Sequence, residues 1–256
     1  KIRLDLDILI VSTANPEDYT NRGRIITPLK DRYGSQIRTH YPQNILEEIT
    51  IMEQEQRKLD LGEYREDVPP FMSQLIAEIT QQARRSPDIN QRSGVSVRAS
   101  VSNYEALLAN ALRRAIEVDE QDVVPRISDL PFIMPSLQGK VEFEAMEEGR
   151  EEKIMERLFQ DATKAVFSRF TEGIKLEPLA LQFADGIHVT TGESLPSKDY
   201  EDIIKKIDGL AEAIEILAPG ANTANRASAV EFILDGLHLN QRLNKDRVGG
   251  RTTYSG

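Results

Sequence analysis

The spacing of hydrophobic residues changes along the chain, from dense runs near the start to helical stripes afterwards. Residues 4–13, LDLDILIVST, form a nearly continuous apolar run of strand length. Such a run is typical of a parallel strand that is buried on both faces. Residues 35–41, SQIRTHY, alternate like a shorter strand and stop at Pro42. We therefore predict the end of an α/β sheet, two strands wide, at the start of the chain.

From residue 43 onward apolar residues recur every three or four positions, which predicts helices that bury one face. A first helix is expected from residue 43 to 59, a second opens at Pro69-Pro70, and a third follows the polar loop SPDINQRSG and ends near residue 120. The predicted inward-facing residues are Ile45, Leu46, Ile49, Met52, Phe71, Met72, Leu75, Ile76, Ile79, Ala83, Val101, Tyr104, Leu107, Leu108, Ala111, Leu112 and Ala115.

The second half of the chain is also helical in pattern. Stripes of apolar residues predict helices over residues 147–170, 199–217 and 224–243. Three prolines and a glycine make residues 125–143 read as a linker or an extended hairpin. The last residues, KDRVGGRTTYSG, have no apolar face and are expected to be disordered.

Together these patterns predict a mostly α protein that begins with the C-terminal end of an α/β core. The expected divisions are a core remnant at residues 1–42, a helical domain at 43–125, a helical extension at 126–245 and a disordered tail at 246–256. No internal repeat is visible. The chain starts at Lys1 rather than Met, and we interpret it as a piece of a longer protein.

Composition excludes several classes of protein. The 256 residues carry a net charge of −10, which disfavours a general nucleic-acid binder. The chain has no Cys, so disulfides, thiol catalysis and cysteine-ligated zinc are excluded, and its three His residues lack metal-ligand spacing. No apolar run approaches the ~20 residues of a membrane span, and no signal peptide is present. A cytoplasmic protein is expected.

Two short motifs suggest a family. The first strand ends in Thr13-Ala14-Asn15-Pro16-Glu17, followed by Gly23-Arg24 and by Leu29-Lys30-Asp31-Arg32-Tyr33-Gly34. A second match is RSGVSVRASVSNYEALLANALRRAIEVDEQDVV, which contains Arg98 and ends in a D-E-x-D-V turn. The order of these motifs resembles the second half of an AAA+ ATPase module, and most closely the I subunit of magnesium chelatase and MoxR-type ATPases. The resemblance covers residues 5 to about 125.

The resemblance implies that Asn15 is sensor 1. ATP hydrolysis needs a positioned water and a cation near the γ-phosphate. A short amide at the end of a strand can orient that water, and Pro16 fixes the backbone after it. The alternative is an Asn-Pro turn that only ends a strand.

The resemblance also implies that Arg32 is an arginine finger, reaching the nucleotide of a neighbouring subunit. A guanidinium is permanently charged and binds phosphate oxygens in a bidentate manner. Arg22 and Arg24 are nearby candidates for the same role, and Arg24 is also expected to contact ATP. The alternative is a surface ion pair between Asp31 and Arg32.

Arg98 corresponds to sensor 2, the lid arginine that contacts the γ-phosphate of its own subunit. In the sequence Val95-Ser96-Val97-Arg98, partial burial of the two valines would direct the arginine toward the core. The alternative is an arginine on a solvated face in the first turn of a helix.

Other elements of an ATPase are missing. The chain has no G-x-x-x-x-G-K-[ST] loop, and its Gly139-Lys140 pair lacks the upstream Gly. No apolar run ends in Asp-Glu, and Ile26 stands where the family often has Arg. The residues that bind most of ATP and Mg²⁺ are therefore expected upstream of Lys1. We predict that this chain alone neither binds ATP tightly nor hydrolyses it.

The resemblance implies a homo-oligomeric ring, a hexamer, that hydrolyses ATP to remodel a partner, and a partner protein with a von Willebrand A domain. An alternative is a non-catalytic helical interaction module in which Asn15 and Arg32 are structural. A transcription activator built on the same ATPase architecture is a third possibility, but no helix-turn-helix signature is present. The acidic run at residues 142–152 is interpreted as a solvated helix start rather than a docking site.

Overall fold

A computed structural model describes residues 7–13, 28, 31–58, 62–91, 93–144 and 149–256. The chain divides into two compact units, residues 1–40 and residues 41–256. The predicted divisions at residues 125 and 245 both fall within the second unit. The described residues are mostly helical, as the hydrophobic pattern predicts.

The first unit lacks the predicted strands among its described residues. Residues 7–13 and 35–40 form no strand, and Ile8 to Val11 are between 50% and 90% exposed. A strand exists only when a neighbour pairs with its backbone groups, and none of the described residues pairs with this run. The prediction of a buried strand here is therefore wrong for this chain.

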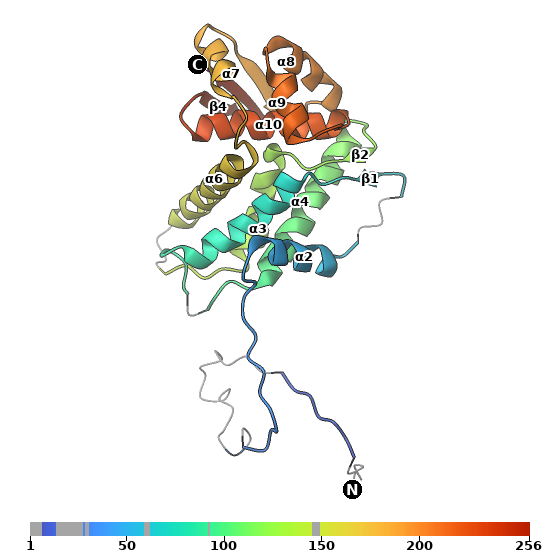
Figure 1. Ribbon diagram of the computed structural model, residues 1–256, viewed down its shortest axis with the longest axis vertical. Helices are drawn as coiled ribbons and strands as arrows, with labels where there is room; N and C mark the ends of the chain where they lie inside the picture. The colour runs from blue at the N-terminus through green and yellow to red at the C-terminus, as the bar shows by residue number, and fades with distance from the viewer. Residues whose placement is uncertain (1–6, 14–27, 29–30, 59–61, 92, 145–148) are drawn as a thin grey trace. The chain divides into compact units, whose positions relative to one another are not determined.

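Three helices open the second unit (Figure 1). They are α2 (Ile45–Glu55), α3 (Pro70–Arg85) and α4 (Val97–Glu117). The inward faces predicted for α3 are fully buried, and α3 starts at Pro70 as predicted. On α2, Met52 is buried but Leu46 is 64% exposed, so the apolar face of α2 is narrower than predicted. The segment before α3 and the segment after α4 pair in parallel as β1 (Arg65–Glu66) and β2 (Asp122–Val123).

Residues 125–143 are part of the core rather than a linker. They form η1 (Ile127–Ile133) and α5 (Met134–Gln138), and both pack on α4. Asp129, which is fully buried, accepts hydrogen bonds from Arg114 Nη2 at 3.0 Å and from Arg126 N at 2.8 Å. Burial alone would lower the pKa of Arg114, but the charge of Asp129 raises it. Pro135 lies in the first turn of α5, whereas Pro131 lies inside η1. The segment is anchored both by this ion pair and by buried apolar residues, namely Ile127, Leu130, Ile133 and Leu137.

The remaining helices include α10 and the elements that pack on it. In chain order, the remaining helices are α6 (Arg150–Phe170), α7 (Glu177–Ala184), η2 (Ser197–Asp199), α8 (Tyr200–Lys206), α9 (Leu210–Leu217) and α10 (Thr223–Leu239). The helix predicted over residues 199–217 is broken between α8 and α9, because Ile207 is extended and Gly209 has a φ of +82°. α10 packs on α6, α8, α9, η1 and η2 and is buried on nearly all sides (Figure 1).

The predicted disordered tail is a β-hairpin. It consists of β4 (Asn244–Val248) and β5 (Arg251–Ser255), and β5 also pairs with β3 (Val189–Gly192). Gly249 and Gly250 form the two-residue turn with φ values of +57° and +78°, the backbone that such hairpins require. Tyr254 is 2% exposed and belongs to the same hydrophobic core as Met52. The tail shows no apolar stripe because the buried positions of β5 are Thr252 and Tyr254, and β4 has no buried position.

Candidate functional site

Two places in the structure carry side chains suited to ligands: the predicted arginines, and a polar cavity that the sequence did not predict. Asn15, Arg22 and Arg24 lie outside the described residues. Arg32 is described and its side chain is exposed. Its Nη1 donates a hydrogen bond to the carbonyl of Pro28 at 2.8 Å. The alternative prediction for Arg32 was a surface ion pair with Asp31, and the described residues include no such pair.

Arg98 is the second residue of α4 and is exposed. Ser96 caps the helix, and its hydroxyl accepts from the backbone N–H of Arg98 at 3.2 Å. Val95 is fully buried and Val97 is half-buried, as the sequence predicted. Their burial does not turn Arg98 toward the core; the side chain faces solvent beside the positive end of the helix dipole.

The helix start that carries Arg98 rests on a buried ion pair. Glu48 on α2 is fully buried, and Arg84 on α3 contacts both of its carboxylate oxygens, at 2.5 and 2.9 Å. Ser100 on α4 donates to Glu48 at 2.6 Å, and its hydroxyl oxygen lies 2.8 Å from the Thr80 hydroxyl, from which it can accept. These contacts tie three helices together within one turn of Arg98.

The backbone just before α4 is held on both sides. The N–H of Val95 donates to the Tyr41 hydroxyl at 3.1 Å, and its carbonyl accepts from Arg84 Nε at 2.9 Å. The Arg84 guanidinium also stacks on the Tyr41 ring at 4.4 Å. Gly94 has a φ of +68°, and a Cβ there would lie 2.3 Å from the Tyr41 hydroxyl, so only glycine fits. Arg98 is therefore presented from a rigid frame.

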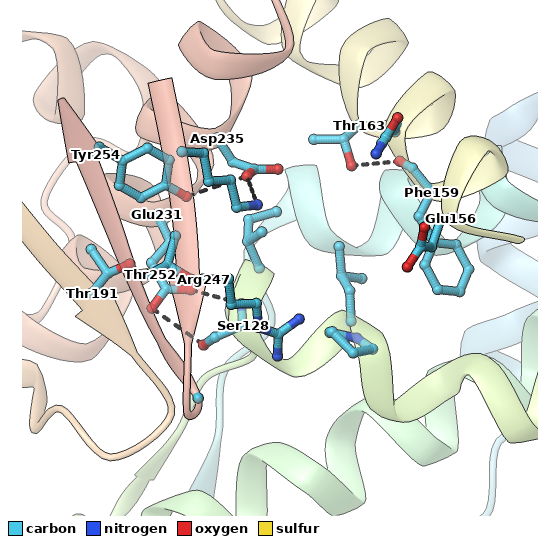
Figure 2. Close-up of a pocket in the computed structure, with 16 residues that line it drawn as sticks. Ser128, Glu156, Phe159, Thr163, Thr191, Glu231, Asp235, Arg247, Thr252 and Tyr254 are labelled. Carbon is cyan, nitrogen blue, oxygen red and sulfur yellow. Dashed lines mark hydrogen bonds and ion pairs between the residues drawn. The ribbon is translucent and has the colours of Figure 1, made fainter. Parts of the chain in front are cut away.

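A cavity of about 250 Å³ lies between η1, α6, α10 and the C-terminal sheet (Figure 2). One wall carries the apolar side chains Phe159 on α6 and Leu130 and Pro131 on η1, beside the polar α6 residues Glu156, Gln160 and Thr163. The opposite wall is polar and is built by α10 and by one face of the sheet.

Two buried carboxylates on α10 face this cavity, Glu231 and Asp235. Glu231 accepts from the backbone N–H of Ser128 at 2.7 Å and from the Tyr200 hydroxyl. Asp235 accepts from Lys245 and from the Tyr254 hydroxyl. Burial and these carboxylates raise the pKa of both tyrosines well above the ordinary value, so both phenols stay protonated and donate.

Sequence reasoning missed the cavity, although one signal was present. Glu231 and Asp235 sit four residues apart in the apolar segment AVEFILDGL. Acidic residues on one face of an otherwise apolar helix indicate a buried polar site. The sheet that completes the cavity was not predicted, because the sequence of its hairpin is polar and was interpreted as a disordered tail.

The described residues contain no group of three His, Asp or Glu side chains that could hold a metal ion. Nor does any of the described helices have the length and apolar character to cross a bilayer. The chain matches no protein-family model, and comparisons with curated proteins and with solved structures give no significant match.

Proposed function

We propose that this chain is part of a ring-forming AAA+ ATPase, similar to the magnesium chelatase I subunit and MoxR-type proteins, that remodels a partner protein. Asn15 and Arg32 are the proposed catalytic residues, and Arg98 and Arg24 the proposed ATP contacts. A partner with a von Willebrand A domain and a hexameric ring follow from the same resemblance, as does a cytoplasmic location.

The observation that supports the proposal most strongly is the position of Arg98, which is exposed at the start of a firmly held helix. An exposed guanidinium at the start of a helix adds its charge to the backbone N–H groups of the first turn, and both favour a phosphate. The buried pair between Glu48 and Arg84 and the two contacts to Val95 hold that start in place. A solvated surface arginine needs no such frame.

Arg32 supports the proposal more weakly. Its charge remains exposed while Nη1 bonds to the carbonyl of Pro28, so one edge of the guanidinium is fixed by its own segment. Such an arginine can reach a phosphate that is bound to a neighbouring subunit. Mg²⁺ would have to be ligated outside the described residues, because these hold no acidic cluster suited to it.

The test is ATP hydrolysis by the protein extended upstream of Lys1 to include a phosphate-binding loop. Arg32→Ala should lower the rate by about 10³-fold or more with nucleotide binding retained, since a finger acts in the transition state. Arg98→Ala should weaken both binding and hydrolysis. Arg38→Ala and Arg85→Ala, which also remove exposed arginines, are the matched controls.

Mixed rings separate action across a boundary from action within a subunit. Arg32→Ala subunits mixed with Asn15→Ala subunits should recover part of the activity, because some interfaces then pair an intact finger with an intact sensor. Normal hydrolysis by Arg32→Ala would refute the finger. An extended protein without ATPase activity or nucleotide-dependent assembly would favour the helical interaction module instead.

A further inference from the structure

We propose that the cavity between α6, α10 and the C-terminal sheet is a binding site for a small neutral polyhydroxylated molecule, such as a single-ring sugar or cyclitol. The proposal does not depend on ATP binding or on Arg32 and Arg98. It rests on unpartnered hydroxyls, on the balance of charge, and on the shape of the lining.

The sheet presents two hydroxyls that the protein does not use. In the strand register Thr191 on β3 lies opposite Thr252 on β5, and Thr252 lies opposite Arg247 on β4. Directly paired residues point to the same face, and all three line the cavity. Thr191 is 3% and Thr252 8% exposed, yet neither hydroxyl has a hydrogen-bond partner among the described residues.

Neither hydroxyl oxygen is among the fully buried polar atoms that lack a partner, so both are open to the cavity and can bond to water or to a ligand there. The threonines nearby have protein partners instead. Thr190 and Thr253, one position along on the opposite face of the same strands, bond to each other at 3.2 Å. Thr163 on α6 donates to the carbonyl of Phe159 at 2.7 Å. The two unpartnered hydroxyls are thus confined to the face that looks into the cavity.

The charges of the lining nearly cancel. Glu156, Glu231 and Asp235 carry three negative charges, and Lys245 and Arg247 carry two positive charges. Buried carboxylates repel phosphate and other anions, while Lys245 and Arg247 repel metal ions. A neutral ligand incurs neither penalty.

The polar wall offers both donors and acceptors to such a ligand. A carboxylate has about four acceptor positions, and Asp235 uses only part of them for Lys245 and Tyr254. Arg247 makes only a long contact to Glu193, at 3.4 Å, and its side chain is 47% exposed. Ligand hydroxyls donate and accept at once, so they match this mixture better than an ion does.

Shape sets the size of the ligand. About 250 Å³ lies just below the range of roughly 300–1,000 Å³ that drug-sized ligands occupy, which leaves room for one ring. Phe159, Leu130 and Pro131 provide apolar contacts for the C–H face of that ring. Thr191, Thr252 and Arg247 face it from the other side.

The test is ligand binding to the 256-residue chain, measured by saturation-transfer NMR and titration calorimetry with glucose and myo-inositol. At least one of the two should bind. The double variant Thr191→Val, Thr252→Val should weaken that binding by about tenfold or more, because two hydrogen bonds are lost. Its melting temperature should be unchanged or higher, since the hydroxyls have no protein partner. The control Thr190→Val, Thr253→Val should bind like the wild type.

Arg247→Gln provides a second variant that does not depend on a buried position, and it should weaken binding severalfold. Absence of binding by both polyols would overturn the proposal, as would equal binding by the Thr191→Val, Thr252→Val variant. Inorganic phosphate and free glutamate serve as probes of other chemistry. Binding of either one in place of the polyols would refute the assignment of a neutral ligand.

Discussion

Arg84 and Glu48 form a bidentate ion pair that joins α3 to α2, with the carboxylate fully buried and the guanidinium side chain 10% exposed. The pair is not isolated. Ser100 bonds to the same carboxylate, and Arg84 also holds the carbonyl of Val95. The ion pair thus supports the beginning of α4, and with it Arg98, together with the contact of Tyr41 to the Val95 N–H.

Replacing the Arg84 guanidinium should leave the buried Glu48 carboxyl group without its ion-pair partner. We expect Arg84→Met to lower the free energy of unfolding by about 3–5 kcal/mol, measured by urea denaturation. Arg85→Met, at the adjacent exposed position, should change it by less than about 0.5 kcal/mol. Equal effects of the two variants would mean that the ion pair contributes nothing specific.

Removing only the hydroxyl of Tyr41 should loosen the approach to α4 without unfolding the protein. Tyr41→Phe keeps the ring that stacks on Arg84 but leaves the N–H of Val95 without its partner. We expect a loss of about 1 kcal/mol and faster hydrogen exchange of the Val95 amide. Exchange in the middle of α10 should not change. Undiminished protection of Val95 would contradict the assignment of this contact.

Alkaline conditions should destabilise the protein through its buried tyrosines. Burial, with Glu66 and Glu53 nearby, raises the pKa of Tyr104 to about 12, and the pKa of Tyr200 and Tyr254 is also raised. Below pH about 10 both folded and unfolded chains hold these protons. Above it the unfolded chain releases them first, so the free energy of unfolding falls by about 1.4 kcal/mol per pH unit for each tyrosine.

Urea denaturation at a series of pH values measures this slope. For Tyr104→Phe, the free energy of unfolding should fall less steeply with pH than for the wild type between the unfolded tyrosine pKa and about 12. Near neutral pH the two curves should be parallel. Identical slopes for the two proteins would show that Tyr104 ionises as easily in the folded state as in the unfolded state.

At Gly236, helix propensity and side-chain packing predict opposite effects of a substitution by alanine. Alanine in a helix interior is normally favoured over glycine by about 1 kcal/mol. A Cβ at Gly236, however, would lie 2.0 Å from the ring of Phe167 on α6. We expect Gly236→Ala to destabilise the protein by about 1–3 kcal/mol, measured by denaturation. Gly139→Ala is the control, because its nearest contact would be an ordinary 3.6 Å and its stability should be equal or higher. A more stable Gly236→Ala would mean that α6 and α10 are not packed this closely.

The sequence predicted those parts of the fold in which one helix buries one face. The burial of Phe71, Leu75 and Ile79 on α3 follows directly from their spacing, and Pro70 marks where the helix starts. Predictions failed where a residue far away decides the outcome. Asp129 anchors residues 126–129 through Arg114, fifteen residues earlier in the chain, and no local pattern reports that.

The candidate sites divide in the same way. The position of Arg98 at the start of a helix was predictable, because a serine cap and a helical stripe define it. The ion pair of Glu48 and Arg84 that supports this helix start was not predictable. An acidic residue such as Glu48 on α2 is expected at the surface, but it is fully buried. The cavity required the hairpin, whose signal was the dipeptide Gly249-Gly250 between residues that suit strands.

The placement of Tyr254 in one core with Met52 has a consequence for biosynthesis. On the ribosome, α2, α3 and α4 emerge with their apolar faces in place before the strands β4 and β5 that finish this interior are synthesised. Until then a partly exposed apolar surface has to be tolerated or shielded by chaperones. A stop codon only a few positions before Tyr254 would therefore affect the whole unit, and not merely its end.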